Sequence, residues 1–265
     1  MKKIAFIGAG NMCRAIVNGL LMSGTLDCEH IKIYDKDEQK ALAFKAIGIY
    51  KCENAVKAAE FADYLFLAIK PQNMQEVLEE LRNVNFENKV VVTIAAGIST
   101  NFIGNFLCNT AIIRVMPNTP MLIGEGTAAI TKNSLVKDDD FDTVCDMFKK
   151  LGTVATMSED KLNPVISLSG SSPAYVFLFI KIMCDWAKEQ GFDEKQAKEL
   201  VCSAFKGSAE LLSVSEKSPD QLIRDVSSPG GTTLAALAEF ENHNFKKTVK
   251  EALNACAKRA AELSK

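Results

Sequence analysis

The chain has 265 residues, of which 48% are hydrophobic and 24% charged, and its formal net charge is −2. This is the composition of an average globular protein that can bury a core, and no block of like charge suggests a nucleic-acid or anionic-membrane surface. The opening MKKIAFIGAGNM has too short an apolar run for a signal peptide, and no later run approaches the roughly 20 apolar residues of a membrane helix. We therefore expect a soluble, cytoplasmic protein with no nucleic-acid or membrane partner.

Residues 3–156 alternate short apolar runs with helical patterns. Runs at 3–7, 31–35, 64–69, 90–95 and 111–116 are almost continuously apolar, while 12–21, 37–47 and 73–81 carry apolar residues at three- and four-residue spacing. Continuous apolar runs are typical of strands buried on both faces of a parallel sheet, and their alternation with helices predicts a doubly wound α/β fold. We expect a Rossmann-like dinucleotide-binding domain over residues 1–159.

From about residue 160 the strand pattern disappears. An amphipathic run follows Asp193, Ser218-Pro219 is typical of a helix start, and apolar residues stripe the segment 245–263. These patterns predict an all-helical domain over residues 160–265. Within it the segment 174–187 is apolar on nearly every side, and a domain of this size could not cover it alone. We therefore expect subunits to associate through the C-terminal half.

Cysteine and histidine usage limits the possible chemistry. The eight cysteines are scattered without a CxxC pair, and the two histidines, His30 and His243, stand among polar neighbours. Without a signal peptide, such cysteines are expected to be reduced and packed as small hydrophobic side chains. The sequence predicts no metal site and no histidine-dependent catalytic group.

The segment GAGNMC, residues 8–13, follows the first predicted strand and opens a helix. Gly8 permits a tight turn, and Gly10 lets the backbone approach a pyrophosphate at the helix N-terminus, where free N–H groups favour anions. The third glycine of the GxGxxG pattern is replaced by Cys13, so the pattern is incomplete. Its position after an apolar strand still favours dinucleotide binding over a plain turn.

Asp35 ends the second predicted strand. A carboxylate there would hold the adenosine ribose hydroxyls and repel a 2′-phosphate, which favours NADH over NADPH. The alternative is a helix N-cap for the run that begins at Lys36, and the ammonium group of Lys36 could itself meet a phosphate. The strands at 64–69, 90–95 and 111–116 end in AIKPQN, AAG and RVMPNTP, and three such tails at one sheet edge predict a lined crevice.

The motifs FIGAGNM, AIKPQ, AAG, RVMPNTP, SLSGSSPAY and VSSPGGTT occur in order along the whole chain and resemble those of pyrroline-5-carboxylate reductases. The resemblance implies reduction of (S)-1-pyrroline-5-carboxylate to L-proline with NADPH or NADH, the last step of proline biosynthesis. It also implies a helical domain that interlocks into homodimers and often larger rings. Ser172, in place of the family's usual glycine, and Cys13 depart from the family pattern, which leaves affinity and cofactor choice open.

The resemblance also implies site residues. Glu216, Ser228, Gly230, Gly231, Thr232 and Thr233 would lie around the substrate, with Ser228 and Thr233 as catalytic candidates and the Thr233 hydroxyl bonded to the ring nitrogen. For the cofactor, the resemblance implies contacts with Gly8, Ala9, Gly10, Asn11, Met12, Cys13, Asn54, Ile69, Lys70, Pro71, Ala95, Ala96 and Gly97. Asp35 and Lys36 are added from the argument on the second strand above.

The stretch VSSPGGTTLAAL, residues 226–237, breaks a helical domain with a proline and two adjacent glycines. A loop of small residues at a helix start exposes N–H groups from about Gly230 to Leu234, an anion site that suits the carboxylate of a small imine acid. The alternative is that Thr232 or Thr233 merely caps the helix, which would account for one threonine but for neither glycine.

Two other functions remain open from the sequence. A 3-hydroxyacid dehydrogenase of similar two-domain build would use a lysine acid on the first long helix of the helical domain, where this chain has only Lys161 and Lys181. A non-catalytic homologue that binds nucleotide as a regulator would not need the intact SSPGGTT segment.

Overall fold

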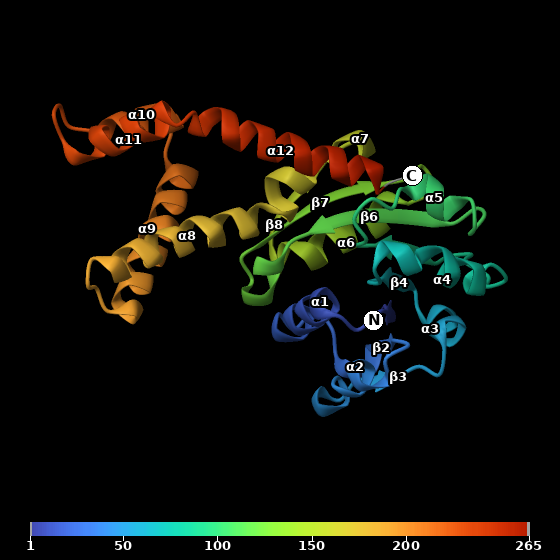
Figure 1. The fold of residues 1–265 in the computed structure, drawn as a ribbon. Coiled ribbons are helices and arrows are strands. Elements are labelled where there is room, and N and C mark those ends of the chain that lie inside the picture. The colour runs from blue at the N-terminus through green and yellow to red at the C-terminus, as the bar shows by residue number, and fades with distance from the viewer. Residues whose placement is uncertain (1, 264–265) are drawn as a thin grey trace. The chain divides into compact units, whose positions relative to one another are not determined.

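The computed structural model describes residues 2–263 (Figure 1). The chain forms two compact units, one comprising the residues up to Pro173 together with those from Ala255 onward, the other comprising Ala174–Asn254. The first unit is α/β and the second is helical, as the sequence predicts. The second unit is therefore inserted between two segments of the first.

The first unit is built on an eight-stranded sheet with the order β3-β2-β1-β4-β5-β6-β7-β8. All five predicted strands are present, and neighbouring strands are parallel except for β6 and β7. The sequence did not indicate β3, β7 and β8, which are either very short or rich in alanine and threonine. The strands are β1 (Ile4–Ile7), β2 (Ile31–Tyr34), β3 (Tyr50–Lys51), β4 (Tyr64–Leu67), β5 (Val90–Thr93), β6 (Ala111–Pro117), β7 (Gly126–Lys132) and β8 (Gly152–Thr156).

Two hydrophobic clusters bury both faces of this sheet. Phe6 of β1 packs in one cluster with side chains of α1 and α6, and Ile7 packs in the other with side chains of α3 and α4. Successive side chains of a strand point to opposite faces, so a strand buried on both sides is apolar without interruption. The helices of this unit are α1 (Asn11–Met22), α2 (Glu38–Leu42), α3 (Ala55–Phe61), α4 (Met74–Leu81), α5 (Thr100–Gly104), α6 (Asp138–Lys149) and α7 (Glu159–Leu162).

A buried polar network joins β6 to α7. The Arg114 side chain is only 3% exposed, and its guanidinium lies 3.4 Å from a carboxylate oxygen of Glu159 and donates to Asn163 Oδ1 at 2.6 Å. Glu159 also accepts hydrogen bonds from the backbone N–H and the hydroxyl of Thr100, at 2.7 and 2.6 Å. Burial lowers the pKa of Arg114 and the Glu159 carboxylate opposes that shift, so the guanidinium keeps its charge.

The second unit has helices but little core of its own. Among its residues only Ala187 and Ala197 are buried, although Phe179 makes ring contacts with Phe205, Phe240 and Phe245. Large apolar side chains are exposed instead, including Val176, Phe177, Leu178, Ile182, Met183, Trp186, Leu200 and Leu211. Its helices are α8 (Ser172–Glu189), which begins in the first unit, α9 (Glu194–Val214), α10 (Pro219–Asp225), α11 (Thr232–Asn242) and α12 (Phe245–Glu262), which ends there.

One expectation about this region needs correction. The helical stretch Glu159–Glu189 reaches a mean hydropathy of 1.5 over an 18-residue window and is long and apolar enough to cross a membrane, by length and composition only. The sequence analysis predicts no such stretch, because Asn and charged residues interrupt every apolar run, but residues 164–170 and 172–189 prove to be helical. Only 11% of that window is buried within the chain, and an exposed apolar surface of this kind is typical of a site that binds another molecule.

We expect that a second copy of the chain covers the exposed face of α8. Phe177 is 62% exposed, so Phe177→Glu should leave the monomer's own packing intact and place a charge in the subunit contact, giving monomers or aggregates in sedimentation at micromolar concentration. Met22 is 89% exposed in the first unit, and Met22→Glu is the matched control that should assemble as the wild type does. A wild-type protein that sediments as a monomer would contradict this expectation.

Candidate functional site

The turn after β1 passes close against the end of β4. Gly8 has a φ of +103°, and a Cβ built on it would lie 2.4 Å from the carbonyl oxygen of Ala68. Its N–H donates to the carbonyl of Tyr34 at 2.7 Å, which fastens the turn to the end of β2 as well. No side chain fits at position 8, so glycine is needed there for the fold itself.

Gly10 has a different reason to be glycine. It is the N-cap of α1 in an extended conformation, and a Cβ built on it would meet no atom within 4 Å. The first N–H groups of a helix have no partner within the helix, and here the space beside them is open. That combination is suited to an anion such as a pyrophosphate.

A pocket of about 280 Å³ opens at this edge of the sheet, where β1, β2 and β4 end. It brings together six of the residues that the sequence predicts for the cofactor and adds several that it missed, among them Tyr34 and Val77. Its lining is Ile7, Gly8, Gly10, Tyr34, Asp35, Lys36, Lys40, Ala68, Ile69, Lys70, Asn73 and Val77.

Asp35 is held by the backbone of the glycine-rich turn. One carboxylate oxygen accepts from the Ala9 N–H at 2.7 Å and the other accepts from the Asp37 N–H at 2.8 Å. Asp35 is not a helix cap, because the N-cap of α2 is Asp37, whose side chain accepts from the Gln39 N–H. An ionised carboxylate has about four lone-pair sites, so Asp35 can accept further hydrogen bonds from the pocket.

Cys13 packs inside the protein. It is fully buried, and burial, reinforced by the nearby Asp35 charge, raises the pKa of its thiol far above the usual value. The thiol therefore stays protonated and does not add a negative charge beside the anion site. Cys13 replaces a smaller residue without changing the electrostatics of the turn.

A second hollow of about 550 Å³ lies between the ends of β4 and β5. Three predicted cofactor residues, Pro71, Ala96 and Gly97, line it with Gln72, Gln75, Ile98, Phe102 and Leu263. Ala95 is buried beneath it, and Gly97 has a φ of +79°. Asn54 lines neither hollow, since its side chain accepts from the Lys57 N–H at 2.8 Å and caps α3.

Asn118 ties the end of β6 to the SLSGSS segment. Its side-chain amide donates to the Ser169 carbonyl at 3.0 Å, and its oxygen accepts from the Thr127 N–H at 2.8 Å. The segment Ile166–Gly170 is a turn of π-helix, a form that occurs frequently at functional sites. The sequence indicates RVMPNTP only as a strand end, and the buried asparagine within it is the missed signal.

Ser172 lies just beyond that π-helical turn. Its hydroxyl donates to the Ser169 carbonyl at 3.4 Å, so its extra atoms have a partner within the chain. Two residues earlier, a Cβ on Gly170 would lie 2.8 Å from the methyl carbon of the flexible Met116 side chain.

In the second unit, VSSPGGTT forms a turn that leads into α11. Gly230 has a φ of +68°, and a Cβ built on Gly231 would lie 2.5 Å from the Ser228 hydroxyl. Gly231 is the N-cap and no side chain caps the helix, so neither Thr232 nor Thr233 has the capping role that was the alternative. Both glycines are required by the turn, and the first N–H groups of α11 remain available to an anion. Glu216 lies in the link between α9 and α10.

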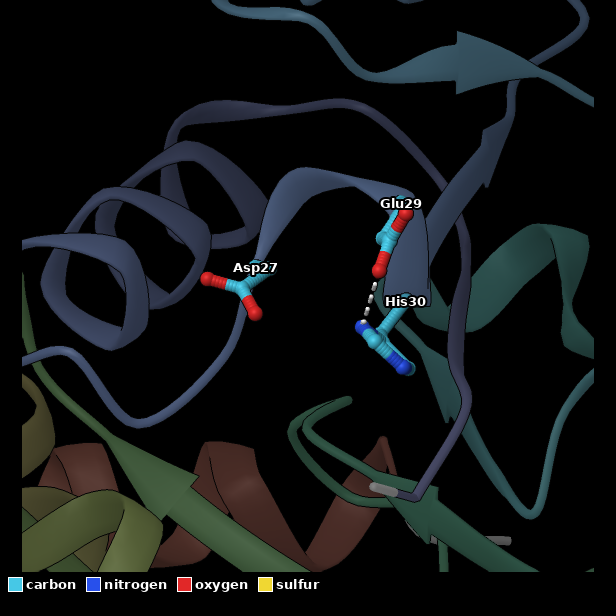
Figure 2. A group of neighbouring side chains, drawn as sticks. All are labelled: Asp27, Glu29 and His30. Carbon is cyan, nitrogen blue, oxygen red and sulfur yellow. Dashed lines mark ion pairs between the residues drawn. The ribbon is translucent and has the colours of Figure 1, made fainter.

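One group of side chains has the composition of a cation site, which the sequence does not predict (Figure 2). Candidate ligand atoms of Asp27, Glu29 and His30 lie within 4.8 Å of one another, and His30 Nδ1 lies 3.8 Å from a Glu29 oxygen. Asp27 and Glu29 are exposed to solvent, so nothing encloses a cation there, and we assign the group no function.

Comparisons with known proteins agree with this arrangement. The family described as pyrroline-5-carboxylate reductase dimerisation matches residues 159–263, and the family described as NADP oxidoreductase coenzyme F420-dependent matches residues 3–97. The chain is 38% identical to pyrroline-5-carboxylate reductase of Escherichia coli over 100% of its own length and 99% of that protein. The chain belongs to the pyrroline-5-carboxylate reductase family.

Solved structures of pyrroline-5-carboxylate reductases share the fold throughout. The Plasmodium falciparum protein with NADP bound is 28% identical with a TM-score of 0.93, covering 100% of this chain and 98% of that one. The Coxiella burnetii protein is 33% identical with a TM-score of 0.88, covering 100% and 99%. Prephenate dehydrogenase from Aquifex aeolicus, at 15% identity, shares the fold alone.

The two glycines of the first turn should respond differently to alanine. Gly10→Ala places a methyl group in open space beside the helix N-terminus, so we expect the KM for the nicotinamide cofactor to rise at least about tenfold while stability changes by less than about 1 kcal/mol. Gly8→Ala should instead cost about 3 kcal/mol of stability, because its Cβ clashes with backbone. Melting temperature at fixed concentration and KM, measured on both variants, test this. A Gly10→Ala enzyme with wild-type KM would place the cofactor elsewhere.

Proposed function

We propose that the chain reduces (S)-1-pyrroline-5-carboxylate to L-proline with a hydride from NADH or NADPH, the last step of proline biosynthesis. Full-length similarity to the Escherichia coli reductase carries this proposal, because the aligned region spans 100% of this chain and so includes both glycine turns. The open N–H groups at the starts of α1 and α11 support it, since the first suits a pyrophosphate and the second suits a small carboxylate.

The reaction asks for positioning more than for a strong acid or base. When bound, the cofactor supplies a hydride to the carbon of the C=N bond, the electrons of that bond pass to nitrogen, and a proton on nitrogen completes the secondary amine of proline. A protonated cyclic imine is already electrophilic, so the protein gains most by fixing the ring at hydride-transfer distance. This agrees with a chain that has only two histidines.

The turn at the start of α11 is the proposed substrate cradle. The N–H groups from Gly230 to Leu234 would hold the carboxylate, with Thr232 beside them, and Glu216 would lie nearby. The Thr233 hydroxyl would accept a hydrogen bond from the iminium N–H and fix which face of the ring meets the nicotinamide. Ser228 is the second catalytic candidate, and its hydroxyl lies against Gly231.

The pocket at the ends of β1, β2 and β4 is the proposed site of the adenosine half of the cofactor. Asp35 would accept hydrogen bonds from ribose hydroxyls and repel a 2′-phosphate, so we propose a preference for NADH. Ile69–Pro71 and Ala95–Gly97 would line the path toward the nicotinamide.

We propose a homodimer formed through the helical half, with larger rings built from dimers. The exposed apolar face of α8 supports the proposal, since a partner subunit would bury this face and the helix would not have to insert into a membrane. We further propose that the substrate is a small molecule, that the protein is cytoplasmic and that it does not act on nucleic acid.

Turnover tests the function directly. Purified protein should oxidise NADH or NADPH only when pyrroline-5-carboxylate is present, and should form one proline for each nucleotide oxidised. Absorbance at the nicotinamide band and chromatography of proline measure the two sides of that balance. Nucleotide binding without proline formation would indicate a regulator instead of an enzyme.

Thr233→Val should reduce turnover far more than stability. A hydrogen bond to a charged group is worth roughly 1.5–3 kcal/mol, and each ~1.4 kcal/mol is tenfold in rate, so we expect kcat/KM to fall about ten- to a hundredfold. Thr248→Val is the control, because that hydroxyl in α12 donates to the carbonyl of Asn244, just before the same helix. Unchanged kinetics with a lowered melting temperature would remove Thr233 from the mechanism.

A further inference from the structure

Three lysines, Lys36, Lys40 and Lys70, and one carboxylate, Asp35, line the nucleotide pocket. We call Asp35, Lys36 and Lys40, together with the neighbouring Asp37 and Glu76, the Asp35 end. Lys36 Nζ lies 2.6 Å from a Glu76 oxygen, and Lys40 Nζ lies 3.2 Å from an Asp37 oxygen. Both lysines at this end are thus already paired, and Asp35 adds a further negative charge to the lining.

The Lys36–Glu76 pair joins the chain just after β2 to α4. Lys36 is two residues beyond β2 and lines the pocket, whereas Glu76 lies in α4 next to Val77, another lining residue. The hydrogen bond that Lys36 donates to Glu76 raises the pKa of Lys36, with a smaller contribution from the charge of Glu80. Lys36 therefore keeps its proton, but its ammonium group points to a carboxylate that neutralises it.

We propose that Glu76 is a specificity-determining residue that disfavours NADPH, because it holds and neutralises the lysine that would otherwise bind the 2′-phosphate. The proposal rests on the proposed cofactor pocket and assigns a role to a helix residue that itself needs no contact with the cofactor. Asp35 acts on the ribose directly, whereas Glu76 acts through Lys36.

The expected change in affinity for the 2′-phosphate follows from the charges involved. A phosphate monoester carries about −1.5 to −2 charges at pH 7, and a unit charge about 6 Å away in water changes its binding free energy enough for about a tenfold change in affinity. A ribose hydroxyl is uncharged, so the same change in the protein leaves its binding nearly unaltered. The effect must also shrink in salt, since the pair is exposed.

Glu76→Gln keeps the size of the side chain and removes its charge. Calorimetry at low salt should show adenosine 2′,5′-bisphosphate bound about tenfold more tightly than by the wild type, with 5′-AMP changed less than twofold. The ratio of kcat/KM for NADPH to that for NADH should rise by the same factor. Glu79→Gln is the matched control, because Glu79 is on the same helix and accepts a hydrogen bond from Gln75 Nε2 at 2.9 Å, whereas Glu76 pairs with Lys36.

The double variant Glu76→Gln with Lys36→Met tests whether Glu76 acts on the phosphate through Lys36 or independently of it. The gain should disappear in it, since no ammonium group remains to meet the phosphate. A gain that persists in the double variant, an equal gain in Glu79→Gln, or no gain in Glu76→Gln would each overturn the proposal. The bisphosphate measurement needs no turnover, so a protein that shows the shift but forms no proline refutes only the proposed function.

Discussion

The end of the sheet that carries the proposed nucleotide pocket depends on how closely the turn after β1 approaches the end of β4. A Cβ on Gly8 would lie 2.4 Å from the backbone oxygen of Ala68, just past β4, so any side chain would push these two segments apart. They are the central neighbours from which the strand order runs outward in both directions, and ligands in such sheets bind where the order reverses. The pocket, the bond between Asp35 and the Ala9 N–H, and the open start of α1 all lie beside this contact.

The second constraint is that the helical half does not bury its own apolar side chains. Its aromatic cluster around Phe179 holds four helices together, but most of the apolar surface of α8 has no cover within the chain. The match to a dimerisation family over residues 159–263 agrees with a role for this surface in subunit contact. The sheet, by contrast, has its own core on both faces.

The sequence predicted the parts of the fold whose signals are local. Buried parallel strands such as β4 and β5 are continuously apolar, and the Ser218 capping box marks the start of α10. It missed β7 and β8, whose alanines and threonines resemble a loop, and it extended one helix over 37–47, where the chain forms α2 and then a separate 3-10 turn, Lys45–Ile47. The 159/160 domain boundary stays a prediction, since the compact units divide after Pro173 and again before Ala255.

In the candidate site, too, some features could be predicted from the sequence and others could not. The glycines at 8, 10, 230 and 231 were predictable, because glycine beside a helix start weakens the helix unless a tight turn or a close ligand requires it. The Asn118 link to Ser169 and the Lys36–Glu76 pair were not, because each joins residues far apart in the sequence through contacts that only the folded chain creates.

The way the helical unit is inserted has a practical consequence for dissecting the protein. The chain leaves the sheet unit near Pro173 and returns at Ala255, so the last helix begins in one unit and ends in the other. The returning segment is packed there, with the Cys256 thiol 3.4 Å from the Ser171 hydroxyl. A stop codon near residue 160 would therefore remove part of the sheet unit along with the helices. A free-standing nucleotide-binding fragment would have to keep both segments and splice them with a short artificial linker.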